Sequence, residues 1–366
     1  MEKYNILYTS CFASLRRGGQ KSLHLLLKHL DKKRFTPFLI VPHAGELSEE
    51  AGRSGVKVFI LPFPAIRVFN LFRIISRLVS LYGLIRKEGI DLIHTESPRE
   101  TFYAGVAGKI SRIPVVLHLR VSDSSHWLDR ILCRLADCMI AVSRSAARRF
   151  ETIGAMDRVR IVYNGVDTDV FRPPDSNGSD TGLLRVGYFG RIERRKGIEV
   201  LVRAAGRLAG RVKLVIMGEG DGRYLDELKE SAAGADVIFK DYKGDIREDI
   251  AGVDAVVLPS LKEEGLPRIM IESMAMGKIV VASDLLSTRE ALGGGLEEFL
   301  FPPGDHMRLA SILGKLAENR QVIHEMKGKL RGRAESVFDI RRNTRQIERI
   351  YDSLRLGGRV QGAGEG

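Results

Sequence analysis

The stretch Val186-Gly-Tyr-Phe-Gly-Arg-Ile-Glu-Arg-Arg-Lys-Gly-Ile-Glu-Val-Leu201 contains the core of a strand–loop–helix unit. Its first part is a short apolar run with little polar alternation, and we expect a strand over residues 185–190. Residues 197–208 then follow a helical period. Strands that are apolar on both faces are typical of a parallel sheet covered by helices. The stretch therefore predicts an α/β fold.

The same unit recurs along the whole chain. Strands are expected at residues 5–10, 37–41, 56–61, 91–94, 115–120, 138–142, 185–190, 213–218, 236–239, 255–258 and 279–282, with helical patterns between them. Residues 164–184 interrupt this alternation with Pro, Gly, Ser, Asn and Asp, which favour loops. We predict two doubly wound, Rossmann-like α/β domains, residues 1–170 and 171–335, facing a central cleft. Residues 336–356 are expected to hold a helix that crosses back to the first domain, and residues 357–366 a disordered tail.

Length and composition agree with this organisation. The chain has 366 residues, which suits two domains. Its three cysteines exclude a disulfide scaffold and form no paired zinc-ligand pattern, so we expect a reducing, cytoplasmic compartment and interpret Cys133 and Cys138 as core residues. The N-terminus enters a strand-like run at once and has no signal-peptide pattern.

Charge is distributed unevenly along the chain. Residues 1–172 hold 27 Lys and Arg against 16 Asp and Glu, a net charge of +11. Residues 173–366 hold 31 against 30, a net charge of +1. The first half is therefore expected to meet an anionic partner: a membrane face, a phosphorylated acceptor or nucleic acid. No recognised nucleic-acid motif accompanies these cations, which disfavours the last of the three.

The richest apolar stretch is residues 66–85, but Arg67, Arg73 and Arg77 interrupt it, which argues against a membrane-spanning helix. A stripe at helical spacing predicts a helix that covers the sheet. The members of this stripe are Phe72, Ile75, Val79, Tyr82 and Ile85. The alternative hypothesis is that its basic rim, with Arg86 and Lys87, rests on anionic lipid.

The most informative block is residues 258–277, which contains two glutamates separated by seven residues. Glu264 is expected in the loop after a buried strand, and Glu272 on a helix that begins near Pro267. Such a helix start favours a phosphate, and carboxylates accept hydrogen bonds from sugar or ribose hydroxyls. The alternative interpretation is that both are solvated helix charges.

Basic residues and glycines mark two further loops. Arg191 and Lys196 lie between Gly190 and the expected helix, where a guanidinium and an ammonium can hold a phosphate. A surface basic loop is the alternative. Gly18 and Gly19 precede a helix in the first half, where glycine allows the backbone to approach a ligand. By contrast, Asp167-Thr-Asp169 is interpreted as a structural turn.

Taken together, these blocks resemble the retaining nucleotide-sugar glycosyltransferases of the GT-B fold, in the glycosyl transferases group 1 family (family 4). The resemblance runs from about residue 4 to residue 320. It is carried by Gly18-Gly19, Ala136-Asp-Cys-Met-Ile-Ala-Val-Ser143, Val162-Tyr-Asn-Gly-Val-Asp-Thr-Asp-Val-Phe171, Gly190-Arg191, Lys196-Gly197, Met217-Gly-Glu-Gly-Asp221, Asp254, Pro259-Ser260 and the Glu264–Glu272 pair, in this order.

The resemblance implies a role for each residue. Arg191 and Lys196 would hold the donor diphosphate beside Gly190. Glu264 would lie by the donor sugar in the loop Glu264-Gly265-Leu266-Pro267, Glu272 would bind the ribose, and Gly18-Gly19 would approach the phosphate. It implies no metal and no cofactor, only a nucleotide-sugar substrate such as a UDP- or GDP-sugar. The histidine that the family commonly has after Ile-Pro-Val-Val is replaced here by Arg120, and His118 lies two residues earlier on the same side of the strand.

The expected function is therefore sugar transfer, with retention of configuration, from a nucleotide-diphosphate sugar to a lipid-linked or phosphorylated glycan acceptor. This is the chemistry of cell-surface polysaccharide or glycolipid (lipopolysaccharide) synthesis, in the cytoplasm or on the inner face of the cell membrane. The alternatives are a sugar-nucleotide epimerase on a similar frame and a basic nucleic-acid-binding protein.

Overall fold

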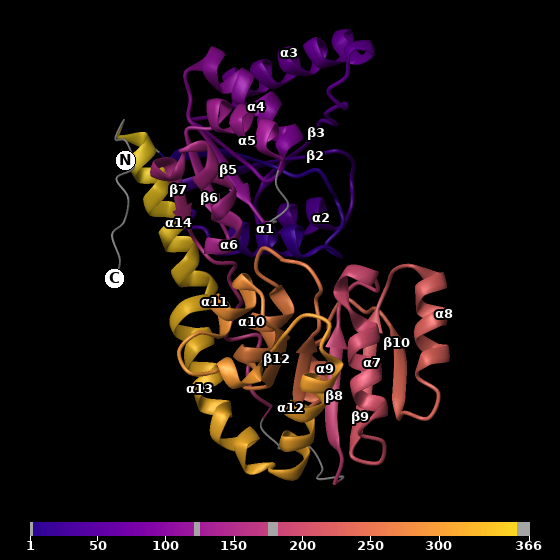
Figure 1. The fold of residues 1–366 in the computed structure, drawn as a ribbon. Coiled ribbons are helices and arrows are strands. Elements are labelled where there is room, and N and C mark those ends of the chain that lie inside the picture. Colours follow the sequence, from indigo (N-terminus) through magenta and orange to yellow (C-terminus); the bar gives the residue numbers. More distant parts are fainter. Residues whose placement is uncertain (1–2, 121–124, 175–181, 357–366) are drawn as a thin grey trace. The chain divides into compact units, whose positions relative to one another are not determined.

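The computed structural model describes residues 3–120, 125–174 and 182–356 (Figure 1). The chain forms two compact units. The first comprises Met1–Gly165 with Ile340–Gly366, and the second comprises Val166–Asp339. The chain passes between them twice, after Gly165 and after Asp339. The tail predicted at residues 357–366 lies outside the described residues.

The first unit is built on a seven-stranded sheet in the order β3-β2-β1-β4-β5-β6-β7, parallel throughout. Its strands are β1 (Tyr4–Thr9), β2 (Phe35–Val41), β3 (Lys57–Ile60), β4 (Leu92–Thr95), β5 (Val115–Leu119), β6 (Cys138–Ala141) and β7 (Val159–Ile161). Its helices are α1 (Gly18–His29), α2 (Glu46–Arg53), α3 (Leu71–Glu88), α4 (Pro98–Ser111), α5 (His126–Leu135), α6 (Arg144–Ala147) and α14 (Ile340–Arg355). The strand order reverses between β1 and β4, which is where such sheets bind ligands.

Helices cover both faces of this sheet because the strands are apolar on both sides. Ile6 and Tyr8 of β1 pack with residues of α1, α2 and α14. Leu7, between them, points the other way and packs with residues of α3 and α4. The continuous apolar runs in the sequence therefore correspond to strands buried on both faces.

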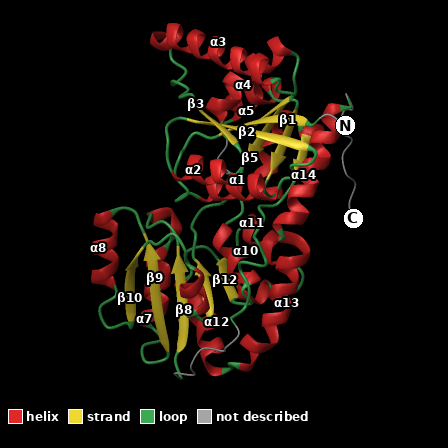
Figure 2. Ribbon diagram, turned by 180° about the vertical axis from the view of Figure 1, so that it is seen from behind, coloured by secondary structure: helices red, strands yellow, loops and turns green. Residues whose placement is uncertain are grey.

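The second unit repeats this design with six parallel strands in the order β10-β9-β8-β11-β12-β13 (Figure 2). Its strands are β8 (Leu184–Phe189), β9 (Val212–Gly218), β10 (Val237–Asp241), β11 (Ala255–Leu258), β12 (Ile279–Ser283) and β13 (Leu300–Phe301). Its helices are α7 (Ile198–Gly206), α8 (Gly222–Ser231), α9 (Arg247–Ala251), α10 (Arg268–Ala275), α11 (Leu286–Leu292), α12 (His306–Glu318) and α13 (Gln321–Phe338). Here the order reverses between β8 and β11.

The predicted fold class, two doubly wound α/β units, is confirmed. Each expected strand is present, with bounds that differ by at most two residues. The strands β7 and β13 were not predicted because they have only three and two residues, too few to display a pattern. Helix α6 is short and gives way to the 3₁₀ turn Arg148–Ile153.

The helix α3 differs from its sequence-based interpretation. Ile74, Leu81 and Ile85 are its buried residues, whereas Phe72, Ile75, Val79 and Tyr82 of the predicted stripe are exposed. The helix therefore packs on the unit through a different set of side chains than the predicted stripe, and one of its apolar faces is exposed. By length and composition alone, Val68–Glu88 is long and apolar enough to cross a membrane, and 17% of its most apolar part is buried. This does not decide between a spanning helix and the predicted covering helix.

Two structural interpretations agree with the observed contacts. Cys133 and Cys138 are buried, and burial raises the pKa of their thiols to about 11 and about 12 respectively. In the turn after the first unit, the Asp167 carboxylate accepts a hydrogen bond from the Asp169 N–H at 3.2 Å. These residues therefore serve packing and turn formation.

Candidate functional site

The second unit brings the two most informative sequence blocks to the same edge of its sheet. Strand β8 leads into the loop that carries Arg191 and Lys196, and β11 leads into the loop that carries Glu264. These strands are neighbours and parallel, so their carboxyl ends meet at the point where the strand order reverses. Parallel pairing thus unites segments about 70 residues apart in the sequence.

Backbone contacts hold the two loops together. The Leu261 N–H donates to the Arg195 carbonyl at 2.9 Å. Gly197, immediately before α7, has φ +62°, and a Cβ there would lie 2.1 Å from the Pro259 carbonyl oxygen. Only glycine fits both this left-handed conformation and this close approach. The position of Lys196 is therefore fixed relative to the β11 loop.

An ion pair links the two loops at the side-chain level. The Lys196 Nζ lies 2.5 Å from Glu264 Oε2, and both side chains are largely buried. Ser260, at the end of β11, donates a hydrogen bond to the other oxygen of Glu264. Lys196 and Glu264 were predicted independently from two sequence blocks, and the structure joins them directly.

Glu272 lies one helix further along the chain, on α10. It is buried and pairs with Arg268 at 2.7 Å, one turn earlier on the helix. The loop before α10 buries Gly265, Leu266 and Pro267, and the helix begins directly after that proline. The start of α10 therefore lies in the same segment as two carboxylates, Glu264 and Glu272, and the pairing partners of both are cations.

Arg191 and its neighbours form an ordered basic loop. The Arg191 guanidinium pairs with Glu193 at 2.5 Å and is half exposed, while the Tyr188 hydroxyl donates to the Arg191 carbonyl at 2.7 Å. A side chain at Gly190 would crowd that same hydroxyl, with its Cβ 3.1 Å away. The exposed Arg191 head can thus exchange Glu193 for an anionic ligand at little cost of desolvation.

Sequence reasoning missed the partners that organise these loops. Glu263 accepts hydrogen bonds from the Leu286 and Ser287 N–H groups at 3.0 and 2.8 Å, and so caps α11. Arg194 forms a two-pronged pair with Glu227 of α8. Charge pairs between distant segments leave no local spacing signal, which is why neither was predicted.

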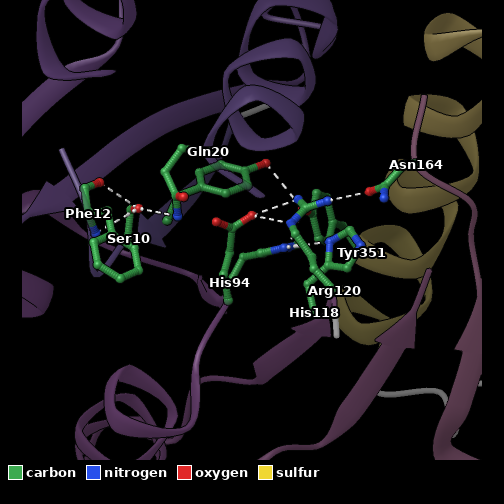
Figure 3. Close-up of polar contacts among 10 residues, drawn as sticks. Ser10, Phe12, Gln20, His94, His118, Arg120, Asn164 and Tyr351 are labelled. Carbon is green, nitrogen blue, oxygen red and sulfur yellow. Dashed lines mark hydrogen bonds and ion pairs between the residues drawn. The ribbon is translucent and has the colours of Figure 1, made fainter. Parts of the chain in front are cut away.

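In the first unit, the loop between β1 and α1 is closed by its own polar groups (Figure 3). The Ser10 hydroxyl donates to the Phe12 carbonyl at 2.9 Å and accepts from Gln20 at 3.2 Å. Helix α1 begins at Gly18 with no side-chain cap. The N–H groups at its start, including that of Gly19, are therefore available to an anion.

Arg120 lies over this helix start. Its Cδ is 3.5 Å from where a Cβ on Gly19 would be, which is ordinary van der Waals contact, so the arginine side chain packs directly against this position. The guanidinium pairs with Glu96 at 2.6 Å and donates to Asn164 Oδ1 at 2.8 Å (Figure 3). Both carboxylate and arginine are mostly buried. The predicted residue is thus rigidly held beside the predicted glycines.

His118 belongs to a buried chain of rings. Its Nδ1 is 3.2 Å from His94 Nε2, and His94 Nδ1 is 2.7 Å from the Tyr351 hydroxyl of α14 (Figure 3). Burial, with the nearby Arg120 charge, lowers the pKa of His94 to about 3 and that of His118 well below its usual range. His118 is therefore neutral, and its Nε2 is buried without a hydrogen-bond partner among the described residues.

Two carboxylates near Arg120 were not predicted. Burial raises the pKa of Glu96, although Arg120 opposes the effect, and raises the pKa of Glu100 to about 7. One oxygen of each is buried without a hydrogen-bond partner in the part of the chain that the structure describes. Glu96 follows β4 directly and Glu100 lies in the first turn of α4, so both come just after a buried strand, a clue that the sequence analysis did not use. Among the described residues, no group of three or more His, Cys, Asp or Glu side chains is arranged to hold a metal ion.

Family models match both halves of the chain. The model described as Glycosyltransferase Family 4 matches residues 16–170, and the model described as Glycosyl transferases group 1 matches residues 184–319. Both candidate sites fall within these matches, which together span most of the two units.

Curated relatives extend the match over most of the chain. The phosphatidyl-myo-inositol mannosyltransferase of Mycobacterium tuberculosis is 30% identical over 74% of this chain and 76% of its own length. The UDP-Gal:alpha-D-GlcNAc-diphosphoundecaprenol alpha-1,3-galactosyltransferase of Escherichia coli is 22% identical over 88% and 90%. The relatives are thus of similar length and domain content.

Among solved structures, HepE from Anabaena in complex with UDP superposes with a TM-score of 0.84 at 22% identity, covering 95% of this chain and all of that one. Sucrose-phosphate synthase from Thermosynechococcus elongatus gives 0.79 at 19% identity, covering 97% of this chain and all of its own. At sequence identities of 19–22%, this structural similarity establishes the fold alone.

Proposed function

Because the chain belongs to the glycosyl transferases group 1 family, glycosyltransferase family 4, we propose that it moves a sugar from a nucleotide-diphosphate sugar to a glycan acceptor with retention of configuration. The observation that carries this proposal is the Lys196–Glu264 pair at the topological switch point of the second unit, beside the start of α10. A cation and a helix start at one sheet edge suit a diphosphate, and paired carboxylates suit hydroxyl groups.

The second unit supplies the donor chemistry in this proposal. Lys196 and Arg191 bind the diphosphate and stabilise the charge that grows on it as the glycosidic bond breaks. Glu264 orients the donor sugar, and Glu272 accepts hydrogen bonds from ribose hydroxyls. Catalysis then consists mainly of positioning and electrostatic stabilisation of the leaving group, with no demand for a metal or a cofactor. UDP- or GDP-sugars are the proposed donors; the HepE neighbour was solved with UDP and with UDP-glucose.

The first unit takes the acceptor, which we place in the class of lipid-linked or phosphorylated glycans. Arg120 is held against the start of α1, where Gly18 and Gly19 are proposed to approach the donor phosphate. Two relatives whose names specify a diphosphoundecaprenol and a phosphatidylinositol acceptor support this class. Residues 1–172 carry a net charge of +11, and this positive charge favours binding of an anionic acceptor.

Attachment to the inner face of the cell membrane follows in the same proposal from α3. Val68 and Phe69, in the 3₁₀ turn before α3, are 92% and 78% exposed, and Phe72 on α3 is 85% exposed. Arg73 and Arg77 lie on α3 as well. An apolar face with a basic rim suits an anionic lipid surface. Flotation with vesicles of phosphatidylglycerol should carry the wild type, and a Phe69→Ser/Phe72→Ser variant should remain unbound, whereas Met307→Ser, an equally apolar exposed change, should leave flotation unaltered.

Incubation with radiolabelled nucleotide sugars tests the reaction itself. Transfer to an acceptor with release of nucleoside diphosphate is expected, and proton NMR of the product should show the anomeric configuration of the donor. Interconversion of the sugar on an intact nucleotide would instead identify an epimerase. Inversion of configuration would refute the proposed stereochemistry and leave transfer itself intact.

A further inference from the structure

A second basic site lies in the first unit, at the far end of α1 from Gly18 and Gly19. Residues from α1, the following turn and α14 line a pocket of about 590 Å³. The lining residues are Lys28, His29, Asp31, Arg34, Arg341, Arg345, Glu348 and Arg349. Since α1 has 12 residues, its two ends lie roughly 18 Å apart at 1.5 Å rise per residue, so this pocket is separate from the candidate site at the helix start.

The acidic groups of the pocket are already engaged. The Glu348 carboxylate accepts a hydrogen bond from the Asp31 N–H at 2.8 Å. The Asp31 carboxylate accepts from the Lys33 N–H at 3.0 Å. Arg34 is bound two-pronged by Asp352, with both distances 2.6 Å. The acids of the pocket therefore hold the turn after α1 through backbone N–H groups and Arg34.

Three of the pocket's cations have no acidic partner within 4.0 Å in the described parts of the chain: Lys28, Arg345 and Arg349. All three are exposed. Arg341, Arg345 and Arg349 follow one another at four-residue spacing on α14, so they lie along a single line on the helix. Like charges at this spacing destabilise a helix. Helix stability therefore does not account for the arrangement, whereas binding of an anion does.

We propose that this pocket binds a diphosphate group, free or at the head of a lipid. Arginines four residues apart are separated by about 6 Å along the helix, so neighbouring guanidiniums can hold two linked phosphoryl groups from one side. Lys28 adds a point charge from α1, where the carboxyl end of the helix already favours cations. The pocket volume lies in the range of small-molecule sites.

A ligand here would connect α1 to α14. Helix α14 begins at Ile340, immediately after the chain leaves the second unit at Asp339. Diphosphate binding therefore favours the packed state of α14 on the first unit and lowers its rate of opening. This effect is independent of the donor chemistry proposed for the second unit.

Calorimetric titration of the full chain with sodium diphosphate, at ionic strength held constant with chloride, tests the site. The variant R345Q/R349Q is expected to lose at least tenfold in affinity, because each charged contact contributes more than a neutral one. The matched control is R203Q/R207Q, which removes two exposed arginines at the same spacing, one in the last turn of α7 and one directly after it. An equal loss in both variants would show a bulk charge effect and overturn the proposal.

Hydrogen exchange locates the binding and separates it from the donor site. Diphosphate should slow amide exchange in Ile340–Arg355 of the wild type and of Lys196→Gln alike, and protection confined to residues 258–276 would overturn the proposal.

Phosphatidylcholine vesicles carrying a polyprenyl diphosphate distinguish a lipid-borne diphosphate from a free one. Flotation that R345Q/R349Q abolishes would identify the lipid-borne group, and binding of free diphosphate without flotation would identify a soluble ligand.

Discussion

Replacement of Gly197 by alanine should test how the two loops of the second unit are held together. Gly197 has φ +62°, and its new Cβ would lie 2.1 Å from the Pro259 carbonyl oxygen. The conformation alone costs about 1–2 kcal/mol for a non-glycine residue. The clash is with backbone, so one loop must move. We expect a further loss of about 1–3 kcal/mol, which is the usual range for overpacking.

The matched control for this variant is Gly210→Ala. Gly210 has φ +74° and nothing within 4 Å of its Cβ position, so it carries the conformational cost without the clash. Urea unfolding followed by circular dichroism should place the midpoint of Gly197→Ala below that of Gly210→Ala. Donor use should fall at least tenfold in Gly197→Ala alone, because movement of this loop separates Lys196 from Glu264. Equal midpoints and equal activity would refute the close approach of the loops.

Lys196→Ala and Glu272→Ala should each reduce kcat/KM for the donor by about 10–150-fold, since a charged contact contributes about 1.5–3 kcal/mol. The control Arg194→Ala should leave kcat/KM near the wild-type value. Steady-state kinetics on variants whose far-UV circular dichroism is unchanged checks this. Burial raises the pKa of Glu100 to about 7, so the folded protein should lose stability as pH rises from about 4.5 to 7, because the unfolded state releases this proton at a lower pH than the folded state does. Denaturant unfolding at a series of pH values should show a smaller pH dependence for Glu100→Gln, and an unchanged pH dependence would contradict the role of Glu100. Arg120→Ala, which leaves a buried Glu96 unpaired, should lower the free energy of unfolding by about 3–5 kcal/mol, and a loss under 1 kcal/mol would contradict the burial of the pair.

The fold could be predicted because each parallel strand is a continuous apolar run, and such runs are visible locally. The candidate donor residues could be predicted because Arg191, Lys196 and Glu264 sit in loops directly after those runs. The exposed side of α3 could not be predicted in the same way. Its apolar residues occur on more than one side of the helix, so periodicity identifies a helix without deciding which line faces the sheet.

The surroundings of Arg120 show a different limit. Glu96, Asn164 and Tyr351 reach the same cluster from three distant parts of the chain, and no spacing in the sequence relates them. Their convergence depends on the strand order, which puts β4 between β1 and β5, and on the packing of α14 against the sheet face that Ile6 and Tyr8 occupy.

That packing gives the C-terminal helix a role in the first-unit site. Tyr351 contacts His94, His94 contacts His118, and His118 lies two residues before Arg120 on the same side of β5. The hydrogen bonds run through neutral rings, because burial and the Arg120 charge both disfavour protonation of the histidines. A change in how α14 packs must therefore alter the support beneath Arg120, since His118 contacts His94 through Nδ1 and its Nε2 has no hydrogen-bond partner among the described residues. Anything that stabilises α14 on the first unit, including an anion held by Arg345 and Arg349, thus acts on the same structural element that supports the acceptor side of the proposed reaction.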